Sequence, residues 1–243
     1  MADKWDLFDR AVDLVAEEKL DDAVKTYQEA IALDADFADA WQGLALALND
    51  LGRHQEAIEA GQLLFGESRV QEARAKIPLL PSRLRWHFIG HLQKNKIRHA
   101  LPLFELFHGI DSLALAQEME RIAEEEGVRP RVLLEVNVAG EASKHGFSPE
   151  ALRRDLEATL SLGRLTIEGL MTLPPFAPEA EASRQYFIAL RKLRDQLESE
   201  YDVRLPQLSM GMSGDFPIAI EEGATLVRVG TAIFGERSRL KRE

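Results

Sequence analysis

Residues 207–235 read QLSMGMSGDFPIAIEEGATLVRVGTAIFG, and the pattern of this stretch decides the fold. QLSMGM (207–212) and TLVRVGTAIFG (225–235) are apolar runs bounded by glycines, which is typical of buried strands. The residues between them begin with a Ser-Gly turn and continue as a short helical segment. A strand, a helix and a second strand in this order predict two parallel strands of one α/β sheet.

The same alternation extends back towards the N-terminus. One helical stretch starts at Ser148-Pro149, and the longest has an apolar face that begins at Tyr186 and ends at Leu197. Strands that alternate with helices predict a parallel α/β sheet, open or closed. No G-x-G-x-x-G follows the first strand, which disfavours a dinucleotide-binding domain. The other predicted strands are residues 85–91, 106–110, 131–138 and 165–173, with residues 64–66 beginning the first.

Two strand ends carry groups that can bind an anion. GMSG (211–214) offers backbone N–H groups and a hydroxyl directly after a strand. Gly230 and Thr231 lie in the last predicted strand, and Arg228 is two positions upstream of Gly230, on the same side. In a barrel, phosphate often binds in the loops after the last two strands. The two segments together predict a phosphate cradle, although Gly and Ser at strand ends are also common turn residues.

The first 60 residues follow a different, helical period. A shift of 34 residues pairs Ala23 with Ala57, and the whole region resembles tetratricopeptide repeats. The spacing predicts four antiparallel helices over residues 5–64, with Gly52 ending the third. The alternative is an ordinary amphipathic hairpin with coincidental spacing. Because fewer than three such repeats bury no continuous core, these helices need support from the region that follows.

Composition narrows the range of functions. The chain has 243 residues, no Cys and a formal net charge of −11. The absence of Cys excludes disulfides and thiolate chemistry, and the negative charge disfavours nucleic acid as a partner. No membrane span or secretory signal is recognisable, so we expect a cytoplasmic protein without a membrane partner.

Six sequence blocks in order resemble the YggS/PROSC-type pyridoxal phosphate homeostasis proteins, over about residues 61–237. The resemblance implies a barrel similar to the N-terminal domain of alanine racemase, pyridoxal 5′-phosphate (PLP) as cofactor, and no well-established turnover. The blocks are FGESRVQEARAKI (65–77), WHFIGHLQKNK (86–96), HGIDS (108–112), VLLEVNVAGEASKHGF (132–147), IEGLMTLPP (167–175) and LSMGMSGDFPIAIEEGATLVRVGTAIFGER (208–237).

The resemblance also assigns roles to the residues of the cradle. It implies that Ser213, Gly230 and Thr231 hold the cofactor phosphate and that Arg228 faces the pyridine nitrogen. A cation there keeps that nitrogen unprotonated, which makes the ring a poor electron sink and suits a carrier better than a catalyst. The alternative for Arg228 is an ion-paired barrel residue.

Five further residues are implied at the same site. Met210, Gly211 and Met212 would line it, and Ser68 and His87 would lie near its mouth. Ser68 stands where the family usually has Asn, which shortens one polar contact. For His87 the alternative is a core histidine with satisfied hydrogen bonds.

One departure from the family limits the chemistry. The family binds PLP through a Lys on the first barrel strand, and the corresponding residues here, ALALNDLGRHQ (45–55), belong to the second repeat. We therefore predict a TIM-type (β/α)8 barrel that lacks its first strand and the Schiff-base Lys. The predicted domains are residues 1–60, with tetratricopeptide-like (TPR) helices, and residues 61–243, an incomplete PLP-binding-type barrel.

These observations predict a PLP homeostasis-type protein that binds the cofactor without the covalent anchor, has no catalytic residues and binds no metal. Whether the protein is an enzyme stays open, and the absent lysine argues against catalytic activity. A first alternative is a TPR protein-interaction module on an inactive barrel scaffold, with a protein partner on the helices. A second, a working racemase or decarboxylase, needs an anchored Lys and a second acid-base group that the sequence does not place.

Overall fold

The computed structural model describes residues 3–17, 19–34, 40, 44, 63–141 and 144–231. The chain divides into two compact units, one of residues 64–229 and one of residues 1–63 with residues 230–243. Each unit is described by itself. The predicted boundary between residues 60 and 61 lies outside the described residues and stays a prediction.

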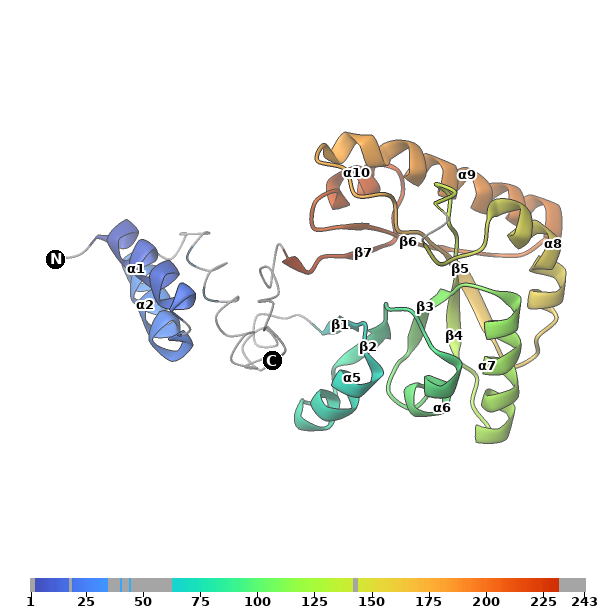
Figure 1. The fold of residues 1–243 in the computed structure, drawn as a ribbon, viewed down its shortest axis with the longest axis horizontal. Helices are drawn as coiled ribbons and strands as arrows, with labels where there is room; N and C mark the ends of the chain where they lie inside the picture. The colour runs from blue at the N-terminus through green and yellow to red at the C-terminus, as the bar shows by residue number, and fades with distance from the viewer. Residues whose placement is uncertain are drawn as a thin grey trace. The chain divides into compact units, whose positions relative to one another are not determined.

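The larger unit is built on one sheet of seven parallel strands whose spatial order follows the sequence (Figure 1). Parallel neighbours joined in sequence order, each by a helical crossover, are the pattern of a barrel. The strands are β1 (Leu64–Glu67), β2 (Arg85–Phe88), β3 (Leu106–Ile110), β4 (Arg131–Glu135), β5 (Thr166–Met171), β6 (Gln207–Met212) and β7 (Leu226–Arg228). The predicted strands are all present, and β2, β4, β5 and β7 are shorter than predicted.

The two end strands are not joined to each other. Within the described part of the chain, β1 pairs only with β2 and β7 pairs only with β6. This is the arrangement expected of a (β/α)8 barrel without one of its strands. The predicted α/β barrel class is therefore confirmed, and the described residues supply seven strands of it.

Helices connect the strands, and Figure 1 shows them on the outside of the sheet. The Ser-Pro signal is confirmed, because the Ser148 side chain accepts a hydrogen bond from the backbone N–H of Ala151 at the start of a helix. The apolar face of the longest helix is corrected by one residue: Phe187, not Tyr186, is buried. The helices are α5 (Val70–Lys76), α6 (Ile97–Ala100), α7 (Leu113–Glu126), α8 (Pro149–Leu160), α9 (Arg184–Tyr201) and α10 (Phe216–Glu221), with 3-10 turns at Ile77–Leu79, Lys94–Lys96 and Ala180–Ser183.

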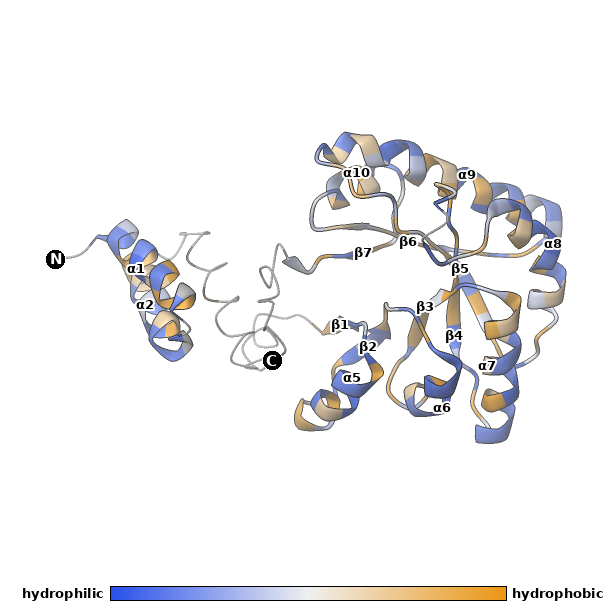
Figure 2. Ribbon diagram, viewed as in Figure 1, coloured by the Kyte–Doolittle hydropathy of each residue, from blue (hydrophilic) through white to orange (hydrophobic). Residues whose placement is uncertain are grey.

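These helices are amphipathic, as Figure 2 shows by the mixture of hydrophilic and hydrophobic residues along α7 to α9. Their buried residues recur every three or four positions, for example Leu152 and Leu156 in α8 or Leu190, Leu193 and Leu197 in α9. This spacing turns one stripe of each helix towards the sheet. None of the helices that the structure describes is long and apolar enough to cross a bilayer.

The smaller unit contains helices α1 (Lys4–Ala16) and α2 (Leu20–Leu33). Asp3 caps α1 and forms a capping box with Asp6, which satisfies N–H groups that would otherwise lack partners. The two helices share a buried cluster that contains the predicted contact residue Ala23. The predicted third and fourth helices, with Gly52 and Ala57, fall almost entirely outside the described residues. The other buried members of the cluster are Leu7, Ala11, Val24, Tyr27, Ala30, Ala40 and Leu44.

We expect Ala23→Leu to lower the free energy of unfolding by about 1–3 kcal/mol. Ala23 has no exposed surface, so three added carbons must displace its neighbours in the cluster. Urea unfolding followed by circular dichroism measures the change. Gln28→Leu, at an exposed position of the same helix, is the control. Identical curves for Ala23→Leu and the parent protein would contradict close packing at this position.

Candidate functional site

The interior of the curved sheet has an apolar layer. Residues of β3 and β7, which are not neighbours in the sheet, meet in it, so this cluster lies inside the barrel rather than under the helices. It consists of Leu106, Leu133 and Met171, with Leu173 and Leu226 packed against them.

A polar layer lies next to it, towards the C-terminal ends of the strands. His108, Glu135 and Arg228 each follow an apolar-layer residue of the same strand by two positions. Because side chains alternate between the faces of a strand, these residues point to the same interior, about 6–7 Å further along. The C-terminal end of the barrel is where TIM-type proteins place their sites.

Four side chains of the polar layer form a hydrogen-bonded chain across the interior. His87 Nδ1 lies 3.0 Å from His108 Nε2, and His108 Nδ1 lies 2.8 Å from the Ser209 hydroxyl. The Arg228 guanidinium donates to the same hydroxyl oxygen and, at 2.8 Å, to the backbone carbonyl of Thr172. Strands β2, β3, β6 and β7 are linked in this way.

The protonation of this chain follows from its surroundings. Burial lowers the pKa of His87 to about 4, and it lowers the pKa of His108 well below its usual range, with Arg228 and His87 adding to the effect. Both imidazoles are therefore neutral at pH 7. Burial lowers the pKa of Arg228 to about 10, against the attraction of Glu135 and Asp215, so the guanidinium keeps its charge.

The contacts of the chain can be made in two directions, because the roles of the imidazole nitrogens depend on the tautomer. In one, the Ser209 oxygen accepts from Arg228, its O–H donates to His108 Nδ1, and His108 Nε2–H donates to His87 Nδ1. In the other, His87 donates to His108 and His108 donates to the Ser209 oxygen. In both, the buried His87 Nε2 has no hydrogen-bond partner among the described residues. A buried polar atom without a partner lowers the stability of the fold, so this end of the chain is a candidate contact for a ligand.

Glu135 brings a carboxyl group to the same layer. Burial and the negative charge of Asp111 raise its pKa to about 7, although His145 and Arg228 oppose the shift. Glu135 is only 6% exposed, so solvent screens these interactions weakly. The site therefore holds one fixed cation and one carboxyl group that titrates near neutrality.

The end of β6, just before the turn, has a backbone that needs glycine. Gly211 has φ +90°, and a Cβ on it would lie 2.5 Å from the Cβ of Ala219. The Asp215 carboxylate then accepts from the N–H of Met212 at 2.7 Å, and the N–H of Asp215 donates back to the Met212 carbonyl at 3.0 Å. Ser213 and Gly214 form the tip of this closed turn.

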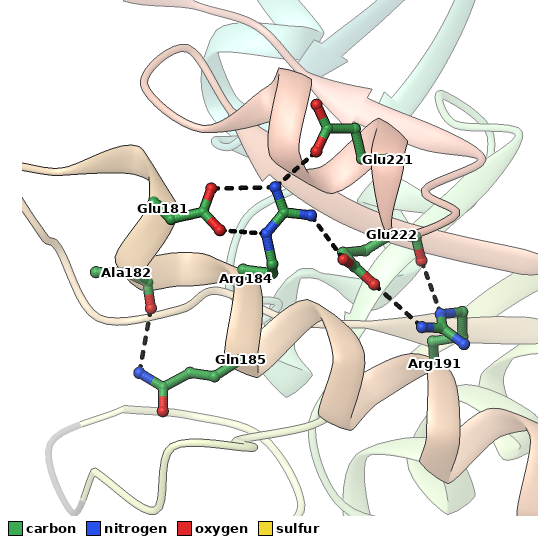
Figure 3. Close-up of polar contacts among 7 residues, drawn as sticks. All are labelled: Glu181, Ala182, Arg184, Gln185, Arg191, Glu221 and Glu222. Carbon is green, nitrogen blue, oxygen red and sulfur yellow. Dashed lines mark hydrogen bonds and ion pairs between the residues drawn. The ribbon is translucent and has the colours of Figure 1, made fainter.

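The helix that follows the turn is fixed to α9 by charges (Figure 3). Arg184 pairs with Glu181, with Glu221 at 2.6 Å and with Glu222 at 2.7 Å. Arg191 holds the Glu222 carboxylate at 3.0 Å and donates to its backbone carbonyl. Helix α10 therefore has a defined position, and so does the turn that precedes it.

Comparisons with known proteins give this geometry a context. The family model of the alanine racemase N-terminal domain matches residues 48–238. A pyridoxal phosphate homeostasis protein of Aquifex aeolicus is 48% identical over 184 residues, 75% of this chain and 81% of the relative. The chain belongs to the pyridoxal phosphate homeostasis protein family. Its Escherichia coli K12 member is 40% identical over 193 residues, 77% of this chain and 81% of the relative.

Solved structures with a similar fold agree with this membership. PipY of Synechococcus elongatus, with PLP bound, is 42% identical to this chain and has a TM-score of 0.70. The match covers 75% of this chain and 86% of PipY. An alanine racemase of Clostridium difficile has a TM-score of 0.60 over 83% of this chain and 53% of its own length, and at 18% identity it shows the fold alone. Residues 8–69 match the tetratricopeptide repeat model, as the 34-residue period predicted.

Within this homeostasis-family barrel, the structure brings two of the predicted site residues together. His87 and Arg228 are the two ends of the hydrogen-bonded chain, and His108 and Ser209, which were not among the predicted site residues, link them. The alternation of side chains was the signal that could have identified them. His108 follows the buried Leu106 by two, and Ser209 precedes Gly211 by two.

The methionines take other positions. Met210 is fully buried and next to Ser209 in β6, so its side chain lies on the opposite face of the sheet, away from the polar chain. Met212, at the end of the strand, is 40% exposed.

The remaining predicted residues lie at strand ends. Ser68 directly follows β1, and its N–H donates to the buried carboxylate of Glu67 at 2.6 Å. Ser213 is at the tip of the β6 turn. Gly230 and Thr231 come directly after the larger unit along the chain, in the residues assigned to the smaller one, so the structure does not define their distance from Ser213.

Proposed function

We propose that this chain binds PLP reversibly at the C-terminal ends of β6 and β7, without a covalent lysine and without turnover. The observation that carries the proposal is Arg228, a charged and half-buried guanidinium held by Ser209 and Thr172 at the end of β7. Membership of the homeostasis family, and a 42% identical relative solved with PLP bound, support it.

The proposal assigns a role to each group. Ser213, Gly230 and Thr231 bind the phosphate, and the conformation of Gly211 sets the direction of the turn that carries Ser213. Arg228 faces the pyridine nitrogen, and Met212 lies at the rim. PLP supplies an aldehyde and an electron-accepting ring when bound, and a guanidinium at its nitrogen reduces the second property.

The neutral histidines act on Arg228 through Ser209. His108 fixes the direction of the Ser209 hydroxyl, and His87 fixes the ring of His108. The Arg228 side chain is thereby held in one orientation before a ligand arrives, which lowers the entropic cost of binding. In this proposal His87 and Ser68 lie near the mouth of the site.

The repeat helices add a second element to the proposal. Residues 1–60 form a TPR-like domain that binds a protein partner, and residues 61–243 form the PLP-binding barrel. The tetratricopeptide match at residues 8–69 supports the first part. The net charge of −11 argues against nucleic acid as a partner. We further place the protein in the cytoplasm, without a membrane partner.

A reduction experiment tests the absence of a covalent anchor. We expect no stoichiometric adduct when the protein is incubated with PLP, reduced with borohydride and measured by intact mass. The lysine after β4 is already engaged by protein groups: Lys144 Nζ donates to the Pro174 carbonyl at 2.8 Å and pairs with Glu141 at 2.7 Å. Lys94 and Lys96 lie in a 3-10 turn after β2.

Equilibrium dialysis of the same samples with PLP measures reversible binding and is read separately. Binding together with scattered adducts far below one per chain agrees with the proposal. A single fully occupied lysine would refute the non-covalent part and leave PLP binding intact. Absence of binding in dialysis would refute the proposal as a whole.

A further inference from the structure

Three side chains from three successive strand ends meet at the mouth of the barrel. His91 follows β2, Asp111 follows β3 directly, and His145 lies in the loop after β4. One ligand atom of each lies within 4.8 Å of the others. His91 Nδ1 is 3.1 Å and His145 Nδ1 is 3.8 Å from the same Asp111 oxygen, Oδ2.

The backbone holds each of these residues in place. Gly90 precedes His91 and lies so close to β1 that a Cβ on it would be 2.3 Å from the carbonyl oxygen of Ser68. Gly146 follows His145 with φ +110°, and a Cβ there would be 2.9 Å from the backbone nitrogen of Asn137. Both glycines are therefore needed for the close approach that brings the two histidines to the mouth.

The aspartate is oriented by a neighbour. The Ser112 hydroxyl donates to Asp111 Oδ1 at 3.0 Å, which leaves Oδ2 turned towards the two imidazoles. A hydrogen bond to the second oxygen of a carboxylate is how metal-binding carboxylates are commonly fixed. Asp111 is also only 12% exposed, whereas both histidines reach solvent.

We propose that His91, Asp111 and His145 form a binding site for a divalent transition-metal ion, with Zn²⁺ as the best-matched ion. Two imidazole nitrogens and one carboxylate oxygen suit Zn²⁺, Co²⁺ and Ni²⁺ and are poor ligands for Mg²⁺ or Ca²⁺. Three protein ligands with the histidines 42% and 60% exposed leave a coordination position open to solvent or to a ligand at the mouth.

The stacking of the two histidines fits this use. Their rings lie 3.9 Å apart between centroids and are tilted by 15°. The two rings are therefore held side by side, with both Nδ1 atoms near the same Asp111 oxygen. The competing explanation is an ion pair between His91 and Asp111 against which His145 stacks, with no affinity for metal.

The test uses the untagged full-length protein after treatment with EDTA and dialysis. Calorimetric titration with Zn²⁺ should give one site per chain. Co²⁺ should give the visible absorption band of an ion with a low coordination number and nitrogen and oxygen ligands. His91→Asn, Asp111→Asn and His145→Asn should each weaken binding by at least about tenfold. His99→Asn, at an exposed histidine of α6, is the matched control and should bind like the parent.

Melting of the metal-free variants shows whether they fold, since the two histidines are exposed and their replacement should leave the melting temperature unchanged. Zn²⁺ binding that is equal in the parent and in all three site variants would place the metal elsewhere and overturn the proposal. Absence of binding to the parent would favour the ion pair. Neither result depends on PLP, because no cofactor is added.

Discussion

Arg228→Ala is expected to raise the dissociation constant for PLP by about 10- to 100-fold. A hydrogen bond to a charged group contributes about 1.5–3 kcal/mol, and every 1.4 kcal/mol changes affinity tenfold. The guanidinium is pre-oriented by Ser209 and Thr172, so its loss removes a contact that is already in place. Equilibrium dialysis at fixed pH and salt measures the effect.

Two controls make this result specific. Arg83→Ala removes an exposed arginine that lies between α5 and β2 and should bind PLP like the parent protein. Thermal melting without ligand reports whether the loss of Arg228 disturbs the barrel, since Ser209 and the Thr172 carbonyl lose a donor. A folded Arg228→Ala variant with parental affinity would remove Arg228 from the site.

Glu135→Gln is expected to change the pH dependence of stability by an amount on the order of 3 kcal/mol. The pKa of Glu135 is raised from an ordinary 4.5 to about 7. Between these values the folded protein binds more protons than the unfolded chain, so the free energy of unfolding falls as the pH rises. Gln is neutral throughout and does not have this cost.

The measured quantity is the difference in free energy of unfolding between the Glu135→Gln variant and the parent protein. Urea unfolding at pH 4.5 and at pH 8 should show the variant gaining stability relative to the parent as the pH rises. His87, whose pKa is lowered to about 4, destabilises the fold as the pH falls below 6.5, but it does so in both proteins and cancels. Glu157→Gln, at an exposed position of α8, should follow the parent. Parallel curves for Glu135→Gln would mean that the carboxylate is stabilised inside the barrel.

Local rules were enough to predict most of the fold. Strands β3 and β6 have the predicted bounds because each is a short apolar run that ends at turn or cap residues. Helix α8 begins at Pro149 because Ser148 caps it and proline suits the first helical position. The seven strands of the described residues were also predictable, since the first block of the family pattern has no counterpart in the chain.

The chemistry of the interior was harder to predict because it depends on how the strands are staggered. His108 and Ser209 are 101 positions apart in the sequence, and their hydrogen bond exists only because the sheet curves until β3 faces β6. The mouth cluster of His91, Asp111 and His145 likewise depends on three loops of different length. Periodicity gives the face of a residue, but it does not give the residue that lies opposite across a barrel.

The linear order of the seven strands has a consequence for how the protein can change. A closed barrel links the tilt and stagger of all its strands at once, so an insertion anywhere must be accommodated around the whole ring. In the described sheet each strand is constrained only by its neighbours, from β1 to β7. The pairing at one end of the described sheet can therefore change without altering the pairs at the other end. A change at β1 would leave the contacts of Arg228 with Ser209 and Thr172 as they are.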